Sequence, residues 1–184
     1  AAIGATASST NAAVALNGSS GLTTTYTTSA KGPVIAALTL ANNGGAPLTL
    51  TLTASHDNAG LAGAISLTYW VRSGTACGTT VPTAGTTTGT LAAPPALPSG
   101  ATTATAGANV VICAATSFTG DYATYAGKSV AVTLTLTGKV GTNWTATGTG
   151  TFTQSLQAAG PSFAPAARYN IRNQSKCLSV FSEG

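Results

Sequence analysis

Charged side chains are scarce in this chain. Only 5% of its 184 residues are Asp, Glu, Lys or Arg, against about 25% in an ordinary globular domain. The net charge of +4 reflects a shortage of acids, with three acidic residues against seven basic ones. A phosphate-binding surface needs a patch or stripe of basic side chains, and the bases cluster only near the end of the sequence. We therefore expect no nucleic-acid partner.

Long apolar runs are missing as well. The chain is 43% hydrophobic, but a membrane-spanning helix needs about 18 consecutive apolar residues, and Thr, Ser or Gly interrupts every run before that length. We expect no membrane span. The sequence begins "AAIGATASST", without Met and without a basic segment ahead of an apolar one. This start is typical of a mature exported product, so we expect a secreted protein, extracellular or at the cell surface.

Side chains that could carry catalysis are few and scattered. His56 is the sole histidine; it precedes Asp57, but no Gly-x-Ser-x-Gly elbow accompanies them. The three acids, Asp57, Asp121 and Glu183, lie in unrelated segments, whereas glycoside hydrolysis needs two carboxylates at a fixed separation. Beyond a weak Ca²⁺ loop at Asp57-Asn58, no cluster of metal ligands is visible. We expect no enzyme activity, no catalytic residues, no cofactor and no metal.

Alternation of aliphatic and hydroxyl side chains dominates what is present. Residues 47–55, "PLTLTLTAS", place three leucines on one face of a strand and three threonines on the other. Similar segments recur between turn residues. They predict an all-β fold, an antiparallel β-sandwich of immunoglobulin-like or jelly-roll type with about eight strands and a C-terminal tail strand. The expected strands lie within residues 11–17, 22–29, 34–45, 47–55, 65–73, 108–116, 128–139 and 143–155.

Two connections between expected strands have distinctive sequences. The break Gly44-Gly45-Ala46-Pro47 predicts a hairpin-like turn between the third and fourth strands. Residues 78–107 are rich in Thr and Pro, and we assign them no regular structure. Cys77 and Cys113 are 36 positions apart, and a bridge between them would clamp the base of this insertion and stabilise the fold by about 3–4 kcal/mol; the alternative is two buried free thiols. Cys177 then lacks a partner within the chain, which indicates intermolecular pairing or a missing partner.

The body of the chain, residues 1–157, resembles the camelysin/TasA-like secreted β-sandwich proteins of Gram-positive bacteria. The resemblance rests on "AAIGATASST", "PLTLTLTAS" and "VVICAATSFTGDYATYAGKSVAVTLTLTG". It implies a subunit of a pilus-like surface filament or biofilm-matrix fibre, whose copies join by donor-strand exchange. The donor would be residues 2–16, with Ile3, Val14 and Leu16 as its large side chains, and the acceptor an unpaired edge of the sandwich. The chain lacks the acidic or histidine cluster that a metalloprotease activity would require.

The end of the chain is different. Residues 168–180, "RYNIRNQSKCLSV", resemble the first strand of a ricin-B-type β-trefoil lectin domain. The matching residues are Tyr169, Ile171, Asn173, Lys176, Cys177, Leu178 and Val180. With "PSFAPAA" as part of a linker at 158–167, residues 168–184 would begin a truncated lectin-like domain, and carbohydrate would be a second partner. The alternative is one extra edge strand.

Two other functions compete with a fibre subunit. The first is a monomeric carbohydrate-binding accessory module of a secreted hydrolase, with Tyr69, Trp70 and Trp144 as stacking platforms. Both tryptophans lie inside strand patterns, which favours a place in the core. The second is a phage or capsid decoration protein. Sequons at 17–19, 143–145 and 173–175 match the N-glycosylation pattern, as a Thr- and Asn-rich chain does by chance.

Overall fold

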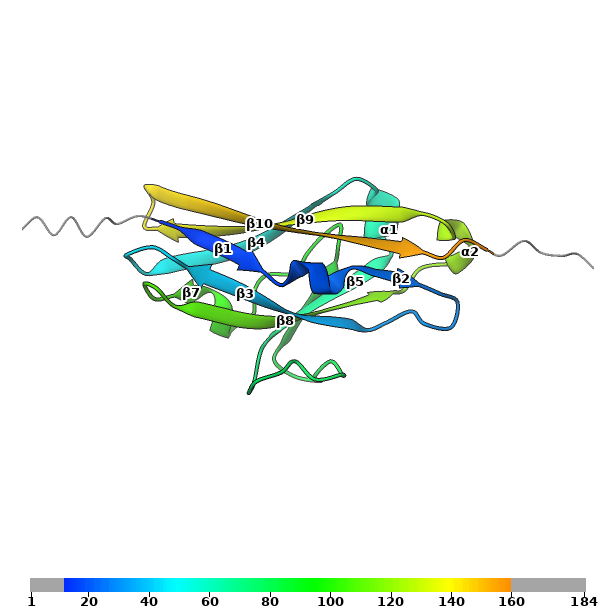
Figure 1. Ribbon diagram of the computed structural model, residues 1–184, viewed down its shortest axis with the longest axis horizontal. Helices are drawn as coiled ribbons and strands as arrows, with labels where there is room; N and C mark the ends of the chain where they lie inside the picture. The colour runs from blue at the N-terminus through cyan, green and yellow to red at the C-terminus, as the bar shows by residue number, and fades with distance from the viewer. Residues whose placement is uncertain (1–11, 160–184) are drawn as a thin grey trace, which may run out of the picture.

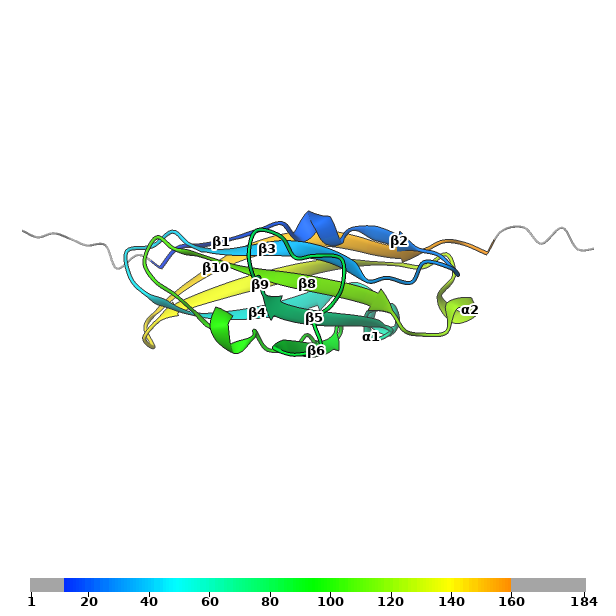
Figure 2. The same cartoon turned by 90° about the horizontal axis from the view of Figure 1, so that it is seen from below.

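The computed structural model describes residues 12–159, which form two packed five-stranded sheets (Figures 1 and 2). The all-β sandwich is therefore confirmed. Sheet A contains, in spatial order, β1 (Val14–Asn17), β3 (Val34–Asn42), β8 (Asn109–Phe118), β5 (Ile65–Val71) and β6 (Thr86–Thr90). Sheet B contains β2 (Thr24–Tyr26), β10 (Trp144–Leu156), β9 (Ser129–Val140), β4 (Leu48–His56) and β7 (Thr103–Ala104). Four short helices connect strands: η1 (Ser19–Leu22), α1 (Ala59–Gly63), η2 (Ser99–Ala101) and α2 (Tyr122–Tyr125).

All eight expected strands are present, and two more lie in the insertion, where sequence predicted none. These are β6 and β7. The hairpin expected between the third and fourth strands is wrong, because β3 belongs to sheet A and β4 to sheet B. The buried amide of Asn42 holds this crossing: its Nδ2 donates to the carbonyls of Ala46, Ala104 and Thr105. A side chain thus replaces the backbone ladder that a hairpin would have formed.

The strand order is that of an immunoglobulin-type Greek key. Taken as seven successive strands A to G, β1, β3, β4, β5, β8, β9 and β10 give A-B-E-D in sheet A and G-F-C in sheet B. β2 and β7 are added at the two edges of sheet B, and β6 is added at one edge of sheet A. Nearly all pairings are antiparallel, and the exception is β2, which runs parallel to the end of β10. The leading part of the chain therefore crosses from sheet A to sheet B through η1.

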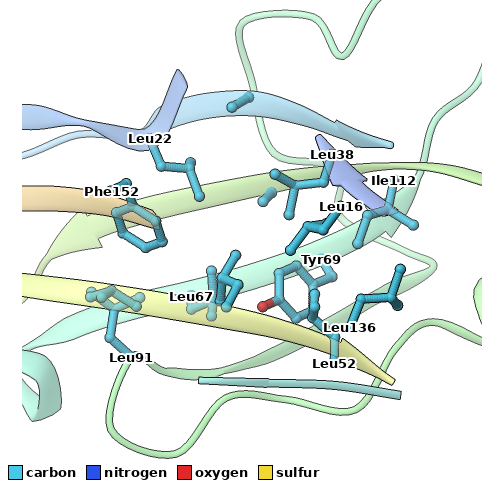
Figure 3. Close-up of a cluster of buried hydrophobic side chains, with 14 of the residues drawn as sticks. Leu16, Leu22, Leu38, Leu52, Leu67, Tyr69, Leu91, Ile112, Leu136 and Phe152 are labelled. Carbon is cyan, nitrogen blue, oxygen red and sulfur yellow. The ribbon is translucent and has the colours of Figure 1, made fainter. Parts of the chain in front are cut away.

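The alternating pattern builds the core directly. In β4, leucines at 48, 50 and 52 are buried while threonines at 49, 51 and 53 are exposed, and β9 repeats the arrangement. Figure 3 shows leucines of both sheets meeting between them, with the Tyr69 ring among them. Each fully buried Leu contributes about 1.5–3 kcal/mol relative to exposure. Period-two placement of aliphatic residues is thus sufficient to hold the two sheets together.

The predicted disulfide between Cys77 and Cys113 is confirmed, with the two Cα atoms 5.6 Å apart. It lies on the outer face of sheet A. There it packs with Trp70, Ala115 and Val81 in a small second core. Cys113 and Trp70 point away from the main core, because their neighbours along β8 and β5 point into it. The insertion is therefore anchored over the outside of sheet A.

The sandwich has two distinct ends along its long axis (Figures 1 and 2). β1 begins at one end, beside the β3–β4 connection and the β9–β10 turn. We call this end the N-terminal pole. α2 lies at the opposite end, next to the last described residues after β10, and we call it the α2 pole. Within residues 12–159 no helix is long and apolar enough to cross a membrane. The predicted tail strand and lectin-like segment lie outside the described residues.

Candidate functional site

Asp57, Asn58 and Asp121 have structural roles, and Asp121 caps α2 through the Thr124 amide. His56 ends β4, and its Nδ1 is buried without a hydrogen-bond partner among the described residues. The Oδ1 of Asp57 accepts a hydrogen bond from the Ala131 amide at 2.8 Å. Asn58 caps α1, its Oδ1 accepting from the Leu61 amide at 3.1 Å. One side-chain oxygen of each residue in the weak Ca²⁺ loop thus has a backbone partner, and the described residues contain no group of three metal-ligating side chains.

An incomplete strand edge is the feature that most resembles a binding site. In sheet B, β4 pairs along its whole length with β9 on one side. On the other side it pairs with β7 over two residues only, Leu48 and Thr49. The rest of this edge, residues 50–56, faces no strand of residues 12–159. An unpaired edge presents free N–H and C=O groups, to which another extended segment can add.

Backbone alternation tells which groups of β4 face the open side. The Leu50 amide donates to the Thr102 carbonyl at 2.7 Å, on the side away from β9. The Asp57 amide donates to Ala131 of β9. Because successive residues of a strand face opposite neighbours, Leu52, Ala54 and His56 direct their backbone groups to the open side. No described backbone group bonds to them there. Three residues are therefore available to pair with an added strand.

A groove runs beside this edge. It has a volume of about 410 Å³ and lies between residues 50–53 of β4 and the segment 94–97, with Thr102 at one end. The wall is the "PPAL" segment of the insertion. Its backbone is tied to β6: the Thr87 hydroxyl donates to the Ala96 carbonyl and the Thr90 amide to the Ala93 carbonyl. We call this feature, the open β4 edge and its wall, the β4 groove. Leu, Pro and Ala side chains make up most of its lining, three threonines complete it, and it contains no charged side chain.

The predicted donor residues divide into two groups. Val14 and Leu16 lie in β1, which pairs antiparallel with β3 of the same chain over four residues. Leu16 is buried in the main core. β1 lies close against β10, where glycines leave room for it: a Cβ at Gly148 would lie 3.0 Å from the Val14 carbonyl oxygen. Ile3 lies outside the described residues. The C-terminal part of the predicted donor, which contains Val14 and Leu16, is therefore already paired with β3 of the same chain.

The predicted stacking platforms do not form one surface. Tyr69 is fully buried. The buried position expected for both tryptophans is confirmed for Trp70, which is 6% exposed. It is wrong for Trp144, whose side chain is 57% exposed. Trp144 begins β10 beyond the end of the core, so strand alternation alone could not tell that nothing covers it. The lectin-like residues Tyr169, Ile171, Asn173, Lys176, Cys177 and Leu178 lie outside the described part of the chain.

Comparison with known proteins does not place the chain in a family. No protein-family model matches it, and no curated protein sequence matches it either. The fold and the β4 groove are therefore the observations that bear on function. An unpaired edge was predictable from the sequence, but the strand that has it was not. Nor was the wall, because the "PPAL" segment carries no strand or helix pattern and its position depends on bonds to β6.

Proposed function

We propose that the protein is an extracellular structural subunit that polymerises by N-terminal strand donation. The leading segment of one copy adds to the β4 groove of the next, and repeated addition gives a surface filament or matrix fibre. The observation that carries this proposal is the open edge of β4, with three outward-facing residues and an apolar groove beside it. The Cys77–Cys113 disulfide suits an oxidising, extracellular location.

The two poles give this addition a direction. β1 begins at the N-terminal pole, so a donor formed by residues 1–11, the leading segment, would leave the sandwich there. The open part of β4 runs in the direction of the α2 pole and ends at His56, which faces Val132 of β9 (Figure 1). A copy whose N-terminal pole faces its neighbour's α2 pole can therefore reach the neighbour's groove. The added strand would run parallel to β4. Such a head-to-tail contact uses different surfaces on the two copies and does not close on itself, so it propagates as a filament.

Residues 1–11 are long enough for this span. Eleven residues precede Ala12 and reach about 36 Å when extended. With Ile3 beside Leu52 in the apolar groove, residues 4–7 accompany β4 to its end at His56. Residues 8–11 then bridge the two copies over about 13 Å. Ile3 is the only large apolar side chain among the first eleven residues, and the wall at 94–97 offers it an apolar surface.

Deleting residues 2–11 tests the donor. We expect the deleted chain to remain monomeric under conditions in which the full chain forms fibres, as seen by electron microscopy and sedimentation velocity. Val14 and Leu16 stay in place, so the sandwich keeps β1. Replacing Ile3 with Asp in the full chain should have the same effect, because the groove would have to bury an unpaired charge. Fibres that persist unchanged in both variants would refute strand donation.

Substitution of Ala54 tests the acceptor. Its amide faces the open side of β4, so proline there removes a donor from the groove without removing a bond to β9. Ala54→Pro should abolish fibres while leaving the far-ultraviolet circular dichroism of a β protein. Ala54→Ser is the matched control, since it keeps the amide and the small side chain, and should assemble normally. Equal assembly of the two variants would exclude the β4 groove.

A further inference from the structure

An exposed tryptophan projects at the N-terminal pole. Trp144 follows the turn 141–143 at the start of β10, opposite Val140 of β9. At 57% exposure it is one of two large hydrophobic side chains exposed among residues 12–159; the other is Val71, at 40%. Tryptophan is the side chain that most often anchors a protein–protein contact, because it buries a large area with few rotatable bonds.

The opposite pole contains a hollow of suitable size. It has a volume of about 710 Å³ beside α2 and the end of β10, and its lining includes Thr28, Tyr122, Ala123, Ala126 and Gln157. No charged side chain lines it. The Tyr122 hydroxyl donates to the carbonyls of Gln157 at 2.8 Å and of Tyr26 at 3.2 Å. These bonds fix the aromatic ring against the end of the sandwich. The hollow therefore exists before any partner arrives, which lowers the entropy cost of binding.

We propose that Trp144 of one copy inserts into this α2-pole hollow of the next copy. The contact rests on the proposed head-to-tail order, which makes the N-terminal pole of one subunit face the α2 pole of its neighbour. It uses none of the residues of the β4 groove. A filament would then have two contacts per junction, a donated strand and a tryptophan anchor. Because both are made by the same pair of copies, the second strengthens the first by raising its effective concentration.

Collisional quenching of fluorescence measures this contact in the full chain. The protein has two tryptophans, and Trp70, at 6% exposure, is shielded from acrylamide whether or not copies associate. The quenchable signal therefore reports Trp144. We expect its quenching constant to fall about threefold or more as the concentration is raised through the assembly transition. The dilute full chain should show Trp144 fully accessible.

Variants at both poles test the pairing of the two surfaces. Trp144→Ala should raise the concentration required for assembly about tenfold or more, as loss of an anchor does. Val71→Ala removes the other exposed hydrophobic side chain, far from either pole, and should change nothing. Ala123→Phe fills the hollow from an exposed position of α2 and should reproduce the effect of Trp144→Ala. A chain with both Trp144→Ala and Ala123→Phe should require no higher concentration for assembly than either single variant, because both substitutions remove the same contact.

The outcomes separate this inference from the proposed function. Fibres in which Trp144 stays as quenchable as in dilute solution would overturn the tryptophan anchor and leave strand donation intact. If the full chain forms no fibres, strand donation fails; the same concentration series then decides the anchor, since protection of Trp144 would support it and its absence would reject it. Protection already present in the dilute chain means that the chain covers Trp144 itself, which also overturns the inference.

Discussion

Tyr26, Thr116 and Gln154 form a buried polar cluster between the two sheets. The Tyr26 hydroxyl lies 2.9 Å from Thr116 Oγ1 and 3.1 Å from Gln154 Oε1. Gln154 Nε2 donates to Thr116 Oγ1 and to the Leu22 carbonyl. The cluster joins β2, β8, β10 and η1, so it holds the leading part of the chain in its crossing from sheet A to sheet B. Buried polar groups are costly unless paired, and every member here has a partner.

Two tyrosine substitutions should show the difference between a paired and an unpaired hydroxyl. Tyr26→Phe leaves Gln154 Oε1 without its partner and should lower the free energy of unfolding by about 1–2 kcal/mol. The hydroxyl of Tyr69 is buried without a partner among the described residues. Tyr69→Phe should therefore leave the free energy of unfolding unchanged or raise it by up to about 1 kcal/mol. Urea denaturation of both variants measures this. Equal losses would contradict the cluster's role.

The same two tyrosines should make the folded chain less stable at alkaline pH. Burial raises the pKa of Tyr26 to about 12, although its hydrogen bonds with Thr116 and Gln154 oppose the shift. Burial also raises the pKa of Tyr69. In the unfolded chain both ionise near pH 10, so above that pH the unfolded chain binds fewer protons and stability falls as pH rises. The slope should be about 1.4 kcal/mol per pH unit for each tyrosine, with no effect from these groups below pH 9.

Denaturation at pH values from 8 to 12 measures this slope, and tyrosinate absorbance shows when the hydroxyls ionise. The double variant Tyr26→Phe, Tyr69→Phe is the control and should lose most of the alkaline decline. A wild-type chain whose stability stays constant up to pH 12 would show that neither hydroxyl is buried in solution.

At the scale of elements, the insertion between β5 and β8 determines the shape of the candidate site. One part of it lies over the outer face of sheet A and is fixed by the disulfide. Another part, residues 94–97, forms the wall of the β4 groove and is tied to β6. Leu91 and Leu97 of the same stretch are buried in the main core. The groove is thus built by irregular backbone that regular strands and one covalent bond hold in place.

Removing the disulfide should therefore loosen both parts. Replacing Cys77 and Cys113 with Ala opens a loop 36 residues long and should lower the free energy of unfolding by about 3–4 kcal/mol. Denaturation with and without reductant measures this, and reductant should have no effect on the double variant. Limited proteolysis should cut first within 78–107. A loss below about 1 kcal/mol would mean that other contacts are sufficient to constrain the insertion.

Across the whole molecule, two features affect assembly together: the two poles differ from each other, and few side chains are charged. β1 and Trp144 begin at the N-terminal pole, and the hollow beside α2 lies at the opposite pole. The contacts proposed between copies are backbone hydrogen bonds along β4 and apolar contacts in the β4 groove and the α2-pole hollow. Because 5% of the residues are charged, association removes little charge from water and gains little from ion pairs.

Assembly should therefore be almost independent of salt. Between about 0.05 and 0.5 M NaCl the Debye length shrinks about threefold, yet we expect the concentration required for assembly to change less than about twofold. Light scattering over a salt series measures this, with ammonium sulfate as a positive control that strengthens apolar association. A steep fall in assembly with NaCl would indicate a contact between charged groups that the two poles do not explain.

The regular part of the structure could be predicted from sequence because it depends on local chemistry. In residues 47–55 and 128–139, Leu or Val alternates with Thr, Ser or Ala, and each such run can bury one face only as a strand. Cys77 and Cys113 lie at the two ends of the insertion, so their pairing was also predictable. β6 and β7 were not, because their threonines, glycine and alanine do not distinguish a strand from a loop.

The sequence is thus sufficient to predict a threonine-covered β-sandwich with very little charge, and it favours a disulfide between Cys77 and Cys113. The tertiary structure alone decided that β3 and β4 lie in different sheets, that β4 keeps an open edge beside residues 94–97, and that Trp144 is exposed while Trp70 is buried. The physical reason is that side-chain alternation specifies which face of a strand is buried. Which neighbours a strand receives depends on contacts between residues far apart in the chain.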